Sequence, residues 1–102
     1  MCIRDRPHIG HAYTSIACDV LARFNRLSKK KTMFLTGTDE HGLKIEQAAK
    51  KKNMDTKKFV DEMSTNFKKL SKTLNLSNDS FIRTTDMFHK KASQHILSLI
   101  HI

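Results

Sequence analysis

The chain has 102 residues, of which 38% are hydrophobic and 28% are charged. This length suits one modest domain, and the composition is typical of neither a disordered chain nor a membrane protein. No apolar run is long enough to cross a bilayer, and residues 1–6 lack the apolar core of a secretory signal, so we expect a cytoplasmic protein without membrane contact.

The net charge is +9, from 19 Lys and Arg against 10 Asp and Glu. Such an excess favours polyanionic partners such as RNA, but most of it is lysine near predicted helix ends, where it suits the helix dipole equally well. The two cysteines, Cys2 and Cys18, form no CxxC pair, so we expect no zinc site within this chain. Cys18 lies in an apolar helical pattern and is expected to be buried.

The first predicted element is a helix over residues 9–28. Apolar residues recur along it at spacings of three and four, which is typical of one helix face. This face comprises Ile9, Tyr13, Ile16, Val20, Phe24 and Leu27, while Asp19, Arg23 and Arg26 form a polar stripe.

A short apolar segment, residues 32–38, then predicts a buried strand of a parallel sheet. A second helix follows, with Ile45, Ala48 and Ala49 at helical spacing and Asn53 as its stop. A third helix is capped by Asp55 or Thr56. Its apolar face comprises Phe59, Val60, Met63, Phe67, Leu70 and Leu74.

Residues 79–85 predict a short strand or an extended link, and Thr85 or Asp86 caps a last helix with Phe88, Ala92 and Ile96 on one face. Helices alternating with short strands predict an α/β fold. In such a fold a parallel strand should precede the first helix, yet nothing before Pro7 has the pattern of one. We therefore expect a sheet that lacks its first strand, and marginal stability for the chain by itself.

His8, Ile9, Gly10 and His11 lie where the first helix begins, directly after Pro7, which is favoured at a helix entry. The unpaired N–H groups of a first helical turn attract phosphate, and two imidazoles three residues apart add donors on the same side. Gly10 lets a flat base approach the backbone closely. Alternatively, the two histidines are ordinary surface residues.

The second candidate site is the segment Thr36–Gly42, at the carboxyl end of the predicted strand, where α/β sheets bind their ligands. Asp39 could hold a cationic group, such as a substrate ammonium, through a charge-assisted hydrogen bond. Alternatively, Asp39 or Glu40 only caps the next helix.

Together, the strings PHIGHAYTSIACDVLARF and FLTGTDEHGLKIEQAA closely resemble the methionyl-tRNA synthetases, which are class I aminoacyl-tRNA synthetases. The resemblance continues through FVDEMSTNFKKL and LNLSNDSFIRTTD and covers residues 7–96. It implies a partial Rossmann-type fold, that is, a doubly wound parallel sheet. It also implies ATP, with Mg²⁺, bound at His8, Ile9, Gly10 and His11, with both histidines on the phosphates, and methionine held at its ammonium group by Asp39.

The family pattern is lost at both ends, in residues 1–6 and 97–102, which we interpret as tails foreign to the family. The family's tRNA(Met)-binding parts and its Lys-Met-Ser-Lys-Ser loop have no match here, so we expect the isolated chain to be inactive. Two alternatives remain: a basic RNA-binding module, which lacks an aromatic stacking platform, and a different nucleotidyltransferase, which the segment Gly37–Gly42 disfavours.

Overall fold

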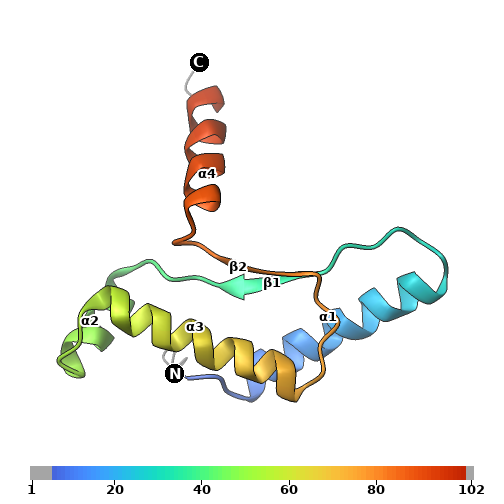
Figure 1. Ribbon diagram of the computed structural model, residues 1–102, viewed down its shortest axis with the longest axis horizontal. Helices are drawn as coiled ribbons and strands as arrows, with labels where there is room; N and C mark the ends of the chain where they lie inside the picture. Colours follow the sequence, from blue (N-terminus) through green and yellow to red (C-terminus); the bar gives the residue numbers. More distant parts are fainter. Residues whose placement is uncertain (1–5, 101–102) are drawn as a thin grey trace.

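A computed structural model describes residues 6–100 and has the predicted order of helices and strands (Figure 1). The elements are α1 (Ile9–Leu27), β1 (Leu35–Thr38), α2 (Leu43–Lys51), α3 (Thr56–Thr73), β2 (Ser80–Arg83) and α4 (Met87–Ile100). The α/β prediction is confirmed. Residues 1–5 lie outside the described part of the chain, and so does any strand before Arg6.

The two strands pair in parallel, with Leu35 opposite Ser80 and Thr38 opposite Arg83. A Cβ atom at Gly37 would overlap the Ile82 carbonyl group, so only glycine allows the strands to approach this closely. Because the pairing is parallel, both strands present their carboxyl ends at the same edge, and α2 and α3 form the connection between them.

The core lies between α2 and α3 and contains Ile45, Ala49, Phe59, Val60 and Met63. The last three belong to the predicted apolar face of α3, and Phe59 is 2% exposed. Both helices end at an asparagine in the left-handed conformation, Asn53 and Asn75, as is common at helix C-termini. The helical pattern was therefore sufficient to predict this part of the fold.

Helix α1 is oriented opposite to the usual expectation for an amphipathic helix. All six residues of its predicted apolar face are exposed, with Ile9 at 87% and Leu27 at 83%. Its polar stripe instead packs on the segment before β2, and Asp19 is buried. Cys18 is exposed, so the prediction that it is buried was wrong. Periodicity predicts which residues share a face, but not whether that face is covered.

Two further differences concern β1 and α4. The predicted strand 32–38 is shorter than expected, and within β1 only Thr38 is buried, since a two-stranded sheet covers little of either face. Helix α4 has no buried residue and projects away from the strands, so Phe88 and Ile96 are exposed (Figure 1). No helix within residues 6–100 is both long and apolar enough to cross a membrane.

Candidate functional site

His8 and His11 come together at the N-terminus of α1. His8 is the N-cap, and its Nδ1 accepts a hydrogen bond from the Gly10 N–H at 3.1 Å. Nδ1 of His11 accepts from the His8 N–H, also at 3.1 Å, so the two imidazoles form a reciprocal capping box. Their ring centroids are 3.9 Å apart. The predicted histidine pair is therefore a structural feature of this helix start.

This arrangement fixes the tautomer of each ring when the ring is neutral. A neutral imidazole that accepts at Nδ1 carries its proton on Nε2 and donates from there. Burial and the neighbouring His8 both lower the pKa of His11, with burial the larger cause, which favours this neutral form. The ring of His11 also meets Phe67 of α3 edge to face at 4.9 Å. Helix packing thus holds the His11 donor in place.

A cavity of about 260 Å³ joins the first candidate site to the sheet. Gly10 and His11 line it from α1, and Thr36 and Gly37 line it from β1. Its remaining lining residues are Thr14, Ser15, Phe67, Leu70, Ser71 and Phe81. Glycines at two of these positions bring backbone to the cavity wall, and the positive end of the α1 dipole opens beside it. These are features that suit an anionic, partly flat ligand.

Asp39 lies directly after β1, is exposed and does not line this cavity. Its carboxylate accepts from the His41 N–H at 3.4 Å. The interpretation of Asp39 or Glu40 as a helix cap is wrong, because the N-cap of α2 is Gly42, which has a φ of 122°. That conformation is open to glycine and strained for other residues, and it starts α2 beyond both carboxylates.

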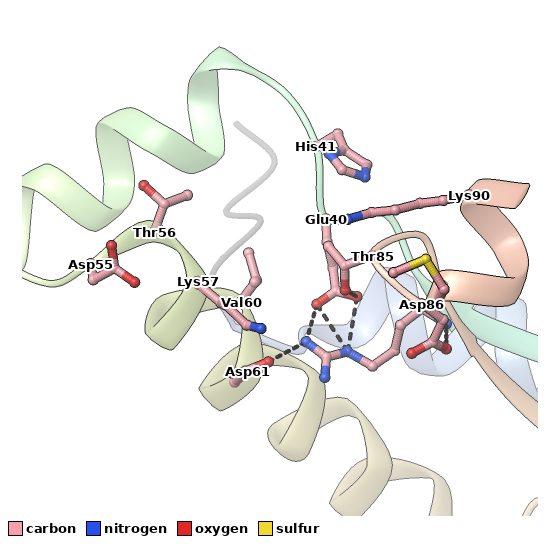
Figure 2. Close-up of a pocket in the computed structure, with 12 residues that line it drawn as sticks. Glu40, His41, Asp55, Thr56, Lys57, Val60, Asp61, Thr85, Asp86 and Lys90 are labelled. Carbon is pink, nitrogen blue, oxygen red and sulfur yellow. Dashed lines mark hydrogen bonds and ion pairs between the residues drawn. The ribbon is translucent and has the colours of Figure 1, made fainter. Parts of the chain in front are cut away.

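Sequence reasoning missed a partly buried ion-pair network at the same sheet edge, built on Arg83 at the end of β2. The Arg83 guanidinium contacts Glu40 through Nε at 3.0 Å and Nη2 at 2.6 Å, and it reaches Asp61 at 2.5 Å. Figure 2 labels Glu40 and Asp61, and its dashed lines mark the bonds that connect both carboxylates to one guanidinium, that of Arg83. These contacts raise the pKa of Arg83, and the bond from Arg83 lowers the pKa of Asp61. The sequence offered one indication of this network, because Arg83 is a charged residue at the end of an otherwise apolar strand segment.

The network borders a second cavity, of about 580 Å³, between α3, the end of β2 and the start of α4 (Figure 2). Lys57 and Lys90 line it, as do Asp55 and Asp86, so its wall carries both signs of charge. Within residues 6–100, no three His, Cys, Asp or Glu side chains gather closely enough to hold a metal ion.

A second polar cluster fixes α1 beside the sheet. Asp19 accepts hydrogen bonds from the N–H and the hydroxyl of Ser77, at 2.7 and 2.6 Å, and pairs with Arg23. Arg26 donates to Ser77 and to Asp79, whose carboxylate also accepts from the Phe34 N–H. The Ser77 hydroxyl is the main cause that lowers the pKa of Asp19, to about 2. The polar stripe therefore anchors the helix that carries the histidines.

Comparisons with known proteins point the same way. Residues 2–101 match the family described as tRNA synthetases class I (M). Over 90 residues the chain is 60% identical to the methionine–tRNA ligase of Rickettsia bellii, and over 89 residues it is 56% identical to that of Lactiplantibacillus plantarum. These alignments cover 88% and 87% of this chain but only 18% and 13% of the relatives.

A solved structure is similar as well: the Mycobacterium tuberculosis methionyl-tRNA synthetase bound by methionyl-adenylate. It aligns with a TM-score of 0.86 and 47% identity, over 91% of this chain and 19% of that one. The chain therefore spans less than a fifth of the length of these relatives.

Proposed function

The chain belongs to the family of class I tRNA synthetases (M), and on this premise we propose that it forms the ATP- and methionine-binding part of a methionine–tRNA ligase. The whole enzyme would activate methionine with ATP and transfer it to tRNA(Met) in the cytoplasm. Residues 7–96 would form part of a Rossmann-type domain.

The observation that carries this proposal is the shared cavity, at which the α1 histidine element and the end of β1 meet. ATP, entering as its Mg²⁺ complex, would place its phosphates at the N-terminus of α1, against Nε2 of His8 and of His11. Ile9 belongs to the same ATP-binding element, and Gly10 would lie against the adenosine, where the absence of a Cβ leaves room for a flat base.

Asp39 would hold the ammonium group of methionine. Its carboxylate is exposed beside the same sheet edge, where ligands of parallel sheets bind. A carboxylate–ammonium contact is charge-assisted and directional, so it orients the amino acid as well as binding it. The methionine carboxylate would then face the ATP phosphates.

The reaction that follows needs no general base, because the methionine carboxylate is already ionised. One of its oxygens would attack the α-phosphorus and form an acyl–phosphate bond, while the bond to the β-phosphate oxygen breaks and pyrophosphate leaves. Charge shifts onto the phosphate oxygens during this step. Preorganised N–H donors at those oxygens, from His8 and His11, would stabilise the transition state.

The test is methionine-dependent exchange between ATP and pyrophosphate. Residues 7–96 replace the matching segment in the full-length Rickettsia bellii enzyme, which supplies the rest of the protein. We expect exchange in this chimera, a fall of about 100-fold in kcat with His11→Ala, and a rise of about tenfold in the KM for methionine with Asp39→Asn. His95→Ala, which removes an exposed histidine of α4, is the matched control and should change neither.

An inactive chimera with native circular dichroism would contradict the proposal. Exchange that proceeds without methionine would favour a different nucleotidyltransferase instead. The 102-residue chain by itself should give no exchange, and clear turnover by it would overturn our expectation that the isolated chain is inactive.

A further inference from the structure

We propose that Arg83 is a positioning residue for the amino-acid substrate. Through the buried carboxylate of Glu40, it fixes the backbone that presents Asp39. The inference rests on the proposed role of Asp39 and adds to it a residue from the other strand, one that would not touch the substrate itself.

The side chain of Asp39 has little support of its own. It is exposed, and in the part of the chain that the structure describes, its carboxylate has one hydrogen bond, the 3.4 Å contact with the His41 N–H. That contact comes from within the same turn and cannot fix the turn against the rest of the protein. The location of the Asp39 carboxylate therefore depends on how the neighbouring backbone is held.

That backbone is held by the segment that follows β2. The carbonyl of Thr38 accepts from the Thr84 N–H at 3.3 Å, and the Glu40 N–H donates to the Thr84 hydroxyl at 2.9 Å. A ring nitrogen of His41 lies 3.2 Å from the Thr84 carbonyl oxygen. Residues on both sides of Asp39 are thus tied to one residue, which directly follows Arg83.

Glu40 makes this attachment depend on Arg83. Its side chain is completely buried, and its carboxylate is satisfied by Arg83, with a further hydrogen bond from the Thr85 hydroxyl at 3.3 Å. Removing one partner of a buried ion pair leaves a charge without compensation, which costs far more than losing an exposed pair. Without Arg83, the buried Glu40 carboxylate loses its charged partner and must move toward water, and Asp39 is its direct neighbour in the chain.

The loss of Arg83 should not affect the residues proposed to bind ATP. His8 and His11 lie on α1, which is held by the separate cluster of Asp19 and Arg26. Neither Glu40 nor Arg83 lines the cavity that Gly10 and His11 line. Loss of Arg83 should therefore weaken methionine binding selectively.

The experiment measures KM for methionine and for ATP in the full-length chimera. With Arg83→Gln we expect the KM for methionine to rise at least about tenfold and the KM for ATP to change less than about twofold, because misplacement of a binding group by a fraction of an ångström is costly. Arg83→Lys, which keeps the charge but not the fork of donors, should restore part of the affinity. Arg26→Gln breaks an ion pair at the opposite end of β1 and serves as the control for lost stability.

An Arg83→Gln variant whose two KM values rise together, or that behaves like Arg26→Gln, would overturn the inference. If the unsubstituted chimera is inactive, the proposed function fails, and the positioning step is measured separately in the 102-residue chain. There, Arg83→Gln should speed amide hydrogen exchange of residues 39–41 about tenfold over Arg26→Gln. Equal exchange in the two variants would overturn the inference.

Discussion

Helices α1 and α3 have the same kind of sequence pattern and opposite environments. Each has apolar residues along one face, but α3 buries Phe59, Val60 and Met63 in the core, whereas α1 leaves its apolar face exposed and packs through Asp19. In Figure 1 α3 lies beneath the strands and packs against α2, while α1 extends beyond them. An amphipathic pattern thus identifies a face that can be buried, and the neighbouring elements decide whether it is.

The difference also separates two kinds of attachment. Helix α3 is held mainly by apolar burial, which does not depend on direction, with the bond between Asp61 and Arg83 in addition. Helix α1 is held by short hydrogen bonds and ion pairs to residues 75–79. Polar attachment of this kind is sensitive to geometry and to pH, while apolar packing is sensitive to volume. Substitutions in α3 should therefore change stability according to the side-chain volume that is lost, and substitutions in the polar stripe of α1 should change how stability depends on pH.

The largest expected effect is the loss of the Phe59 ring. Phe59→Ala should lower the free energy of unfolding of the 102-residue chain by about 3–5 kcal/mol, because it removes apolar contacts and leaves a cavity. Phe59→Leu should cost less and keeps the test usable if the alanine variant does not fold. Urea unfolding followed by circular dichroism measures both.

Phe24→Ala is the matched control on the exposed face of α1, where the side chain is 62% exposed. It should change the free energy of unfolding by no more than about 0.5 kcal/mol. Equal losses at Phe24 and Phe59 would mean that the two faces are buried alike and would remove the contrast between the helices.

A smaller effect should appear on acidification. Because the pKa of Asp19 is lowered to about 2 in the folded chain, its contribution to stability is present above its ordinary pKa near 4 and is lost as the pH falls toward 2. Asp19→Asn should therefore lower the free energy of unfolding at neutral pH by about 1–2 kcal/mol and flatten the decline between pH 4 and 2. Part of the loss of stability on acidification should remain in this variant, because the pKa values of Asp61 and Asp79 are also lowered in the folded chain.

Glu46→Gln is the control for the acid titration, since Glu46 forms an exposed ion pair with Lys50 on α2. Exposed ion pairs contribute little to stability. The fall in the free energy of unfolding between pH 4 and 2 should therefore be the same in this variant as in the unsubstituted chain. An Asp19→Asn variant with unchanged stability at neutral pH would contradict the polar attachment of α1.

The smallest effect concerns how the two helices end. Asn75 follows α3 with a φ of 50°, and Lys29 follows α1 with a φ of 58°, a conformation that lysine adopts less readily than asparagine or glycine. Lys29→Gly should raise the free energy of unfolding by about 0.5–1 kcal/mol, seen as a rise of a few degrees in Tm. Lys30→Gly, at a neighbouring exposed position without a positive φ, should give no such gain.

The candidate site was predictable in part for a definite reason. His8, Gly10 and His11 interact within one helical turn, so their spacing alone predicted that the rings would lie together. The role of Asp39 remains a prediction, since its geometry depends on another strand. The network of Glu40, Arg83 and Asp61 was missed because it joins residues up to 43 positions apart, and no local pattern links such residues.

Some features of this protein follow from local sequence, and others depend on tertiary contacts. The sequence by itself determined the order of helices and strands, the parallel α/β class and the apolar face of α3, because helical periodicity and strand length are local properties. Only the tertiary structure decided that Asp19 is buried while Phe24 is exposed, and that Arg83 holds the end of β1 through the buried side chain of Glu40. Those outcomes depend on which elements pack against one another. A buried charge is tolerated in the folded chain only where residues distant in the sequence compensate it.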